Sequence, residues 1–426
     1  MQIYNQPPPS QWPALLKRPL INAPDLEATV GQLLQDVAQR GDTALRELTL
    51  RFDKVQLDAL AVSSEEITEG ARQVEPELQA AIQLAHDNIA RFHEAQRQES
   101  IRIQTMPGVA CWQKSVAIEK VGLYIPGGTA PLFSTVLMVG VPARIAGCQE
   151  LVLCTPPQAD GSINPVILYT AQLLGIDKIY KLGGAQAVAA MAYGTETVPA
   201  VNKIFGPGNQ YVTTAKQIVS RGGVAIDMPA GPSEVLVLAG ENANPDFIAA
   251  DLLSQAEHGV DSQVVLLAFS AALAEQTLLA IERQLESLER AEMARVALQN
   301  SPAIVVQDRA AALHLINEYG PEHLILAMDD AEQFAEGIRN AGSVFLGHYT
   351  PESVGDYASG TNHVLPTNGY AKAYSGLNLD AFVKKITFQQ LSPQGLRNIG
   401  PAVERMAEAE QLTAHRNAVS VRLKTL

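Results

Sequence analysis

Gln255 and His258 stand three residues apart in the last turn of a predicted helix. Asn244 is suited to cap this helix, Pro245 to its first position and Gly259 to a left-handed stop. Residues at i and i+3 share a helix face, so an amide oxygen and an imidazole could bind one cation, which the negative helix end also favours. A solvated polar helix end explains the same two residues, so the spacing alone does not establish a metal site.

Glu322 and His323 follow a Gly-Pro turn and open a short apolar run that we predict to be a strand. A carboxylate beside an imidazole provides two groups that can transfer protons near neutral pH. Loops at the strand ends of open α/β folds bind ligands, which favours a catalytic role. Adjacent Glu and His residues are also common on ordinary protein surfaces, and both interpretations remain open at this point.

A Gly- and Ser-rich loop, residues 351–366, holds Asp356 and His363. Loops of this composition bury little apolar area, so their polar residues often serve binding. A carboxylate with an imidazole would complete a nitrogen and oxygen site of the kind that zinc accepts. The alternative is a turn that is capped by its own aspartate.

Glu410 and His415 are five residues apart in a segment with a helical pattern. On one continuous helix their side chains would diverge by about 140°. They could converge only if the helix breaks near Leu412 and Thr413 caps a new one. A solvated charged helix is the simpler interpretation.

Three turns that contain glycine, residues 124–128, 183–187 and 205–209, each follow a predicted strand. Glycine lets backbone amides approach a phosphate at a helix N-terminus. The dinucleotide fingerprint G-x-G-x-x-G is missing from the sequence. The turns therefore predict at best an atypical dinucleotide site.

The composition is that of a large acidic protein with abundant core material. Of 426 residues, 47% are hydrophobic and 18% charged, so we expect several compact units with a sizeable core. The net charge of −14, with no block of basic residues, disfavours nucleic acid as a partner. Three cysteines without a C-x-x-C pair, and no visible signal peptide, favour a cytoplasmic location. The uncharged stretch between Lys120 and Arg144 is cut by prolines and a Gly-Gly pair, so we expect buried α/β structure and no membrane span.

The elements that must position these residues are those of an α/β protein. The first ~100 residues have helical periodicity, including an amphipathic helix behind Pro76. From about Ala117 onward, short apolar runs that end in Gly or Pro alternate with helical patterns, which indicates parallel sheets covered by helices. We predict strands at 150–156, 178–183, 203–206, 234–240, 263–269, 303–307 and 343–347. The last ~50 residues return to a helical pattern.

Six longer phrases of the sequence closely resemble the L-histidinol dehydrogenase family, and the match follows the whole chain in order. The phrases are VGLYIPGGTAPL (121–132), KIFGPGN (203–209), IDMPAGPSE (226–234), SQAEHG (254–259), GPEHL (320–324) and GDYASGTNHVLP (355–366). Such long and unusual phrases are far more specific than the short motifs above. The resemblance implies a zinc enzyme, with one zinc per subunit, that catalyses the last step of histidine biosynthesis. It would oxidise L-histidinol to L-histidine through L-histidinaldehyde and reduce two NAD.

The resemblance also implies a role for each candidate residue. The zinc ligands would be Gln255, His258, Asp356 and His415. Proton acceptors would be Glu322 and His323. Histidinol would contact the four ligands and His323, together with Ser233, His363 and Glu410. NAD would contact Tyr124, Gln186 and Asn209.

Pattern and resemblance together predict two incomplete Rossmann-like units with parallel sheets, helical segments at both ends and an intertwined homodimer. We expect a mainly helical segment over 1–112, a unit with the NAD site over 113–232 and a unit with the catalytic and metal residues over 233–370. A helical tail over 371–426 would carry Glu410 and His415 into the partner's site. The active sites would thus be shared between subunits.

Two other functions fit parts of the pattern. A zinc hydrolase would also use a glutamate beside a metal-bound water. A ligand-binding α/β protein without turnover would explain the paired units and the glycine turns, but it leaves Glu322 and His323 without a role. Nicotinamide absorbance that rises with histidinol would distinguish the dehydrogenase from both.

Overall fold

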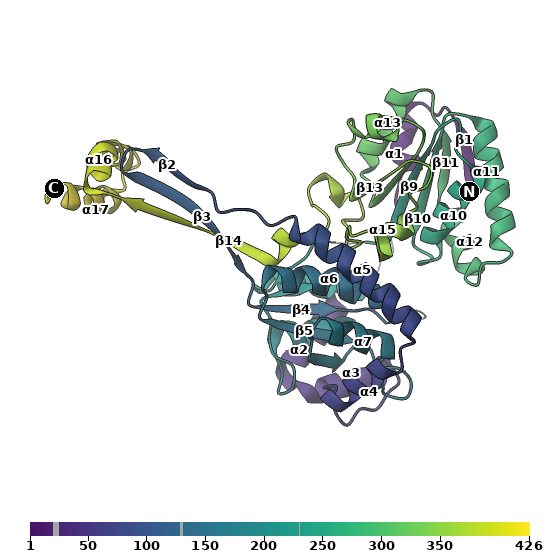
Figure 1. Cartoon of the computed structure of the whole chain (residues 1–426), viewed down its shortest axis with the longest axis horizontal. Helices are drawn as coiled ribbons and strands as arrows, with labels where there is room; N and C mark the ends of the chain where they lie inside the picture. The colour runs from purple at the N-terminus through teal and green to yellow at the C-terminus, as the bar shows by residue number, and fades with distance from the viewer. Residues whose placement is uncertain (20–24, 128–130, 230) are drawn as a thin grey trace.

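The computed structural model describes residues 1–19, 25–127, 131–229 and 231–426, which build two parallel sheets and a long antiparallel arm (Figure 1). The first parallel sheet has the strand order β6-β5-β4-β7-β8. Its strands are β4 (Lys120–Tyr124), β5 (Glu150–Thr155), β6 (Lys178–Lys181), β7 (Lys203–Phe205) and β8 (Ala225–Ile226). The helices that alternate with them are α6 (Phe133–Ala146), α7 (Pro165–Leu173), α8 (Gly184–Tyr193) and α9 (Gln210–Arg221). The inner strands are buried apolar runs, as expected of a parallel sheet covered on both faces.

Four helices of the N-terminal segment pack against this first sheet. They are α2 (Leu26–Arg40), α3 (Asp42–Phe52), α4 (Ser64–Arg72) and α5 (Pro76–Glu94), so the amphipathic helix predicted behind Pro76 is confirmed. Val30 and Leu34 of α2 share a buried cluster with Val188 of α8. Ile89 of α5 shares another with Met138 of α6. These helices therefore complete the hydrophobic core of the first sheet.

The second parallel sheet has the order β1-β11-β10-β9-β12-β13. Its strands are β1 (Gln2–Asn5), β9 (Glu234–Ala239), β10 (Gln263–Ala268), β11 (Pro302–Val305), β12 (His323–Ala327) and β13 (Ser343–Leu346). The helices of this part are α1 (Trp12–Leu15), α10 (Pro245–Ala256), α11 (Ala271–Leu285), α12 (Ala291–Gln299), α13 (Arg309–Tyr319), α14 (Ala331–Ala335) and α15 (Glu352–Tyr357). Strand β1 pairs in parallel with β11 from Gln2 opposite Pro302 onward. The start of the chain is thus an edge strand of the second sheet, where the sequence pattern indicated helix.

The arm consists of the antiparallel strands β2 (Arg102–Met106), β3 (Val109–Ala117) and β14 (Val383–Leu391), with the helices α16 (Pro393–Ala409) and α17 (Thr413–Leu423) at its tip. Figure 1 shows the arm projecting away from both parallel sheets, with the C-terminus at its far end. The predicted helical tail contains α16 and α17, but it also contains the strand β14, which was not predicted and pairs with β3 over its whole length. Every residue of β14 after the first is exposed. Its sequence therefore lacks the continuous apolar run by which a buried core strand is predicted.

In the described part of the chain, no helix is long and apolar enough to span a membrane. The uncharged stretch after Lys120 forms β4 and α6, with the loop between them only partly described. Residues 134–143 of α6 are buried. This confirms the expected buried α/β segment.

Candidate active site

The predicted catalytic residues lie at the amino edge of the second parallel sheet. His323 is the first residue of β12, which pairs with β9, and Glu322 precedes it. The Glu322 carboxylate accepts a hydrogen bond from the backbone N–H of Glu234, with Oε2 2.8 Å from the nitrogen. Nδ1 of His323 lies 3.1 Å from the backbone oxygen of Glu234. Ligands of open α/β sheets commonly bind at the carboxyl ends of the strands. Glu322 and His323 instead lie at the amino ends, on the opposite edge of the sheet.

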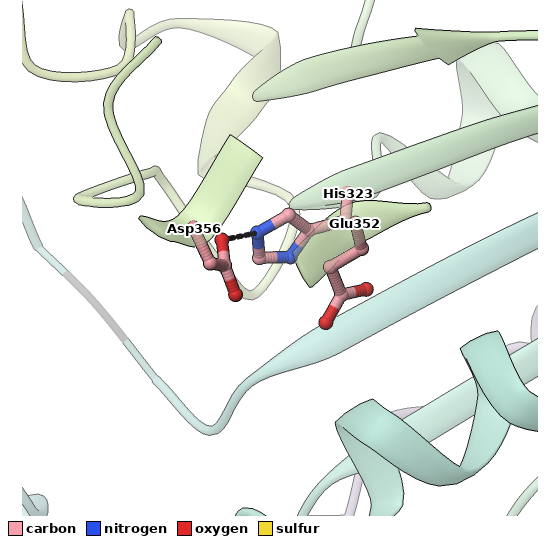
Figure 2. Close-up of side chains that lie close together, drawn as sticks. All are labelled: His323, Glu352 and Asp356. Carbon is pink, nitrogen blue, oxygen red and sulfur yellow. Dashed lines mark ion pairs between the residues drawn. The ribbon is translucent and has the colours of Figure 1, made fainter. Parts of the chain in front are cut away.

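Helix α15 brings two more carboxylates to His323 (Figure 2). Glu352 and Asp356 are four residues apart and therefore share one helix face. Ligand atoms of His323, Glu352 and Asp356 all lie within 4.8 Å of one another, with Nε2 of His323 3.4 Å from Oδ1 of Asp356. Within the described residues, three buried atoms of this cluster have no hydrogen-bond partner: His323 Nε2, Glu352 Oε2 and Asp356 Oδ1. The cluster thus has the donor atoms and the geometry of a cation site.

The charges of this cluster are strongly coupled. Burial raises the pKa of Glu322 and of Glu352 to about 8. Burial lowers the pKa of His323, but the carboxylates of Glu352, Glu322 and Asp356 outweigh it and raise that pKa well above its usual value. Burial also raises the pKa of Asp356, yet the His323 imidazole brings it below its usual value. Because burial favours the neutral forms of Glu322 and Glu352, a cation bound among these carboxyl groups would favour their ionised forms instead.

Gln255 and His258 approach the same edge from α10. Asn244 caps this helix and Pro245 opens it, as predicted, but the helix ends at Ala256 and not at Gly259. Gln255 is buried in its last turn. Its side-chain amide lies between the backbone N–H of Glu234 and the carboxylate of Glu352. In one orientation the amide oxygen accepts a 3.0 Å hydrogen bond from the Glu234 N–H, and in the other orientation the oxygen faces Glu352 and the cluster.

His258 lies beyond the end of α10 and is exposed. Its Nδ1 is 2.9 Å from the backbone oxygen of Ser254, so Nε2 is the nitrogen that faces a prospective ligand. The His258 charge lies close enough to lower the pKa of Asp356, after burial and the larger effect of His323. Three of the four predicted metal ligands therefore lie near one another in a single chain.

His363 connects this site with the first unit. Its Nδ1 lies 2.9 Å from the backbone oxygen of Asp356, and its Nε2 lies 3.3 Å from the hydroxyl of Thr135 in α6. Burial lowers the pKa of His363. Ser233 is half-buried one residue before β9, at the same edge of the sheet. Both predicted substrate-binding residues thus lie beside the cluster.

Tyr124, Gln186 and Asn209 line one cleft of about 1210 Å³ at the carboxyl edge of the first sheet. Tyr124 ends β4, and its hydroxyl accepts a 3.0 Å hydrogen bond from the N–H of Gly184 at the start of α8. Burial raises the pKa of Tyr124 to about 12, so the phenol stays neutral at ordinary pH. Asn209 caps α9 by accepting from the N–H groups of Tyr211 and Val212. Each predicted glycine turn thus follows a strand and contributes residues to this cleft, although Gly128 of the first turn lies outside the described residues.

Glu410 and His415 lie on the arm, which Figure 1 shows far from β9 and α15. The helix breaks where the sequence allowed a break. Helix α16 ends at Ala409, Gln411 has a left-handed φ of 61° and α17 begins at Thr413, with Leu412 in the capping position. Glu410 and His415 are exposed. One chain therefore does not bring them to the other predicted site residues.

Three acidic residues near these sites were not predicted. Glu352 belongs to the cluster with His323 and Asp356, Glu234 contacts both predicted catalytic side chains through its backbone, and Asp53 lines the cleft of the first sheet. The four-residue spacing of Glu352 and Asp356 behind Pro351 was a usable signal, because it places both on one face of a helix. Asp53 and Glu234 carry no comparable local signal.

Comparisons with known proteins agree with the resemblance in the sequence. The family model of histidinol dehydrogenase matches residues 16–423. Histidinol dehydrogenase of Bacteroides thetaiotaomicron is 60% identical over 426 residues, which is 100% of both chains, and that of Pectobacterium atrosepticum is 55% identical over 97% of this chain and 93% of its own. The crystal structure of histidinol dehydrogenase from Elizabethkingia anophelis is similar with a TM-score of 0.97 and 55% identity, over 100% of this chain and 98% of that one. This chain therefore belongs to the histidinol dehydrogenase family and is an oxidoreductase.

Proposed function

We propose that this protein is a zinc-dependent homodimer that oxidises L-histidinol to L-histidine through L-histidinaldehyde, with reduction of two NAD. This reaction is the last step of histidine biosynthesis. The observation that carries the proposal is the cluster at the amino edge of the second sheet. There Glu322 and His323 lie beside three residues that could bind a metal ion, namely Gln255, Glu352 and Asp356. The three cysteines are free, which supports a reducing, cytoplasmic location.

The donor set fits a metal ion. Gln255, His258 and Asp356 of one subunit, with His415 of the partner subunit, would supply the amide, carboxylate and imidazole donors that zinc accepts. The unpartnered buried oxygens Oδ1 of Asp356 and Oε2 of Glu352 support a cation at this position. Zinc, one per subunit, would supply a fixed anchor for the imidazole and amine nitrogens of histidinol.

His323 and Glu322 would divide the proton transfers. His323 would accept the proton of the histidinol hydroxyl as hydride leaves the carbon. Glu322 would then accept a proton from the water that hydrates the aldehyde, before the second hydride leaves to form the carboxylate. Burial raises the pKa of Glu322 to about 8, so its carboxylate binds a proton more tightly than an exposed glutamate does, and a cation beside it would favour the ionised form that accepts a proton.

Ser233, His363 and the partner subunit's Glu410 would hold histidinol around these groups. A carboxylate such as that of Glu410 complements a cationic substrate amine. Retention of the aldehyde between the two oxidations would protect a reactive intermediate from side reactions.

The cleft beside Tyr124, Gln186 and Asn209 would bind NAD, which would accept both hydrides. Helices α8 and α9 both begin at this cleft, and backbone N–H groups at helix N-termini favour a phosphate. The usual G-x-G-x-x-G fingerprint is absent. In this site the three separate turns that contain glycine would take its place beside the phosphates of NAD.

The arm supports the homodimer. It carries apolar side chains that are more than a third exposed: Ile103, Ile386, Phe388, Met406, Leu412 and Val421. Exposed apolar surface of this kind marks an interface. A second copy of the chain is the fitting partner, because the arm also holds Glu410 and His415, the two predicted site residues that one chain leaves isolated.

The test is a spectrophotometric assay of purified protein with L-histidinol and NAD. We expect two NADH for each histidinol consumed, with L-histidine as the product. A protein that leaves NAD unreduced in the presence of histidinol would contradict the dehydrogenase. One that binds histidinol without consuming it would favour a binding protein.

A further inference from the structure

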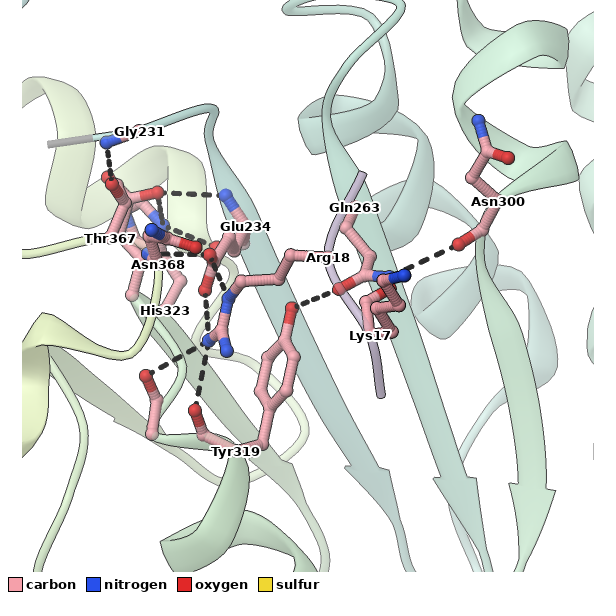
Figure 3. Close-up of polar contacts among 12 residues, drawn as sticks. Lys17, Arg18, Gly231, Glu234, Gln263, Asn300, Tyr319, His323, Thr367 and Asn368 are labelled. Atoms are coloured by element: carbon pink, nitrogen blue, oxygen red, sulfur yellow. Dashed lines mark hydrogen bonds and ion pairs between the residues drawn. The ribbon is translucent and has the colours of Figure 1, made fainter. Parts of the chain in front are cut away.

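Arg18 and Glu234 form a largely buried ion pair next to the proposed catalytic residues (Figure 3). Nε of Arg18 is 2.5 Å from Oε1 of Glu234, and its Nη2 is 2.8 Å from Oε2, which is a two-pronged contact. The exposed fractions of the two side chains are only 17% and 3%. Arg18 also lies 4.0 Å over the ring of Tyr319 and donates to the backbone oxygen of that residue at 2.9 Å.

Glu234 connects this ion pair to the chemistry through its backbone. Its N–H donates to Oε2 of Glu322, and its carbonyl oxygen lies 3.1 Å from Nδ1 of His323. The pairing of β9 with β12 begins one residue later, at Val235 opposite His323. The backbone N–H and C=O of Glu234 are therefore not used in the pairing of β9 with β12, and they contact the side chains of Glu322 and His323 instead.

The side chain of Glu234 is anchored from two directions. Besides Arg18 from the N-terminal segment, the backbone N–H of Asn368 donates to Oε1 at 2.6 Å. Thr367 next to it accepts from the backbone N–H of Gly231, just before β9. Segments far apart in the sequence thus meet at one carboxylate and fix the residue that carries the catalytic hydrogen bonds.

We propose that Arg18 and Glu234 are positioning residues, whose ion pair fixes the Glu234 peptide and through it the orientation of Glu322 and His323. This inference rests on the proposed function. A buried ion pair contributes little net stability compared with well-packed apolar side chains, so stability alone does not account for it. Misplacement of a reacting group by about 1 Å can slow a reaction by about a hundredfold.

Two variants test the proposal. Arg18→Lys keeps the positive charge but lacks the planar two-pronged contact. The double variant Arg18→Met with Glu234→Gln removes both charges together, so that no unpaired charge stays buried. A matched control is Arg144→Lys, because Arg144 is a partly buried arginine of α6 that donates to the backbone oxygens of Leu174 and Gly175, away from both sites.

The readouts are kcat and KM for both oxidations, zinc content and melting temperature of the full dimer. We expect Arg18→Lys to lower kcat about tenfold and the double variant about ten- to hundredfold, with histidinol and histidinaldehyde oxidation reduced alike, because one peptide holds both catalytic groups. KM for NAD and zinc content should stay at wild-type values, and Arg144→Lys should keep wild-type kcat.

Wild-type kcat in both variants would overturn the inference, as would a loss that only parallels lost zinc or a lowered melting temperature. These results require an active wild-type enzyme. A wild-type protein that leaves NAD unreduced would instead overturn the proposed function, and the positioning role with it.

Discussion

Nε2 of His363 lies 3.3 Å from the hydroxyl of Thr135, which joins the loop that carries His363 to helix α6 of the first unit. The other ring nitrogen lies 2.9 Å from the backbone oxygen of Asp356. His363 is thus held from both sides, and one of its contacts comes from the unit that forms the proposed NAD cleft. Both parallel-sheet units therefore help to position His363, a proposed substrate contact.

Thr135→Val should weaken histidinol binding. Valine keeps the shape of threonine but cannot hydrogen-bond to His363, and one such bond contributes about 0.5–1.5 kcal/mol. We expect KM for histidinol to rise roughly two- to tenfold by that measure, with KM for NAD unchanged. Thr170→Val is the matched control, because the Thr170 hydroxyl donates to the backbone oxygen of Val166 within α7. Equal KM values for both variants would refute a role of Thr135 in the substrate site.

Glu322→Gln and His323→Asn should separate the two oxidations. Glutamine can still accept from the N–H of Glu234 but cannot take a proton, so the hydration of the aldehyde should slow about 10²- to 10⁴-fold. Asparagine at 323 should abolish oxidation of the alcohol. Rates measured with histidinol and with supplied histidinaldehyde distinguish these effects. Wild-type oxidation of histidinaldehyde by Glu322→Gln would contradict the role assigned to Glu322.

Removal of the metal should abolish activity and lower stability. Dialysis against a chelator takes away the cation that we place beside Asp356, and zinc should restore turnover. Because a ligand that binds only the folded state stabilises it, zinc at about a hundredfold over its Kd should add about 2.7 kcal/mol to the free energy of unfolding. Melting curves with and without zinc measure this effect. Full activity in a sample verified to be free of metal would exclude the metal site.

Most strands of the two parallel sheets could be predicted because buried parallel strands are continuous apolar runs. All seven predicted runs are strands, at β5, β6, β7, β9, β10, β11 and β13. Strands β1 and β14 escaped prediction because they lack such runs. Strand β1 has only four residues at a sheet edge, and β14 carries Lys and Gln side chains that face solvent.

The site was harder to predict, because its residues meet through strand pairing and not through spacing. Glu322 reaches the backbone of Glu234, 88 residues away, because β12 lies beside β9. Spacing did suggest Gln255 and His258 as candidates, and the composition of a loop suggested Asp356. No local pattern favoured His415, whose assignment depends on the family resemblance, since its proposed partners belong to another copy of the chain.

Asp53 should make stability depend on pH. It lines the proposed NAD cleft, and burial raises its pKa from 3.8 to about 6. The folded state therefore binds this proton more tightly than the unfolded state, so the stabilisation is complete below about pH 4 and is lost as the pH rises through about 6. Asp53→Asn should melt roughly 1–3 °C above the wild type at pH 7.5 without NAD, with a smaller difference at pH 5. Asp58→Asn, at an exposed position, is the control. A wild type more stable than Asp53→Asn at pH 7.5 would contradict this effect of burial.

Mixed dimers should reveal whether active sites are shared. The body of a subunit is the part outside the arm. His323→Asn removes a proposed catalytic group from the body, and His415→Asn removes a proposed zinc ligand from the arm. If the arm of each subunit serves the partner's site, a dimer of one variant with the other contains one site with both changes and one site with neither. Random mixing in equal amounts should then restore about one quarter of the wild-type sites. Mixtures of His323→Asn with Glu322→Gln are the control, because both changes lie in the body and every site keeps one of them. Activity no higher than that of the separate variants would show that His415 does not complete the site of a partner, and the shared-site homodimer would have to be abandoned.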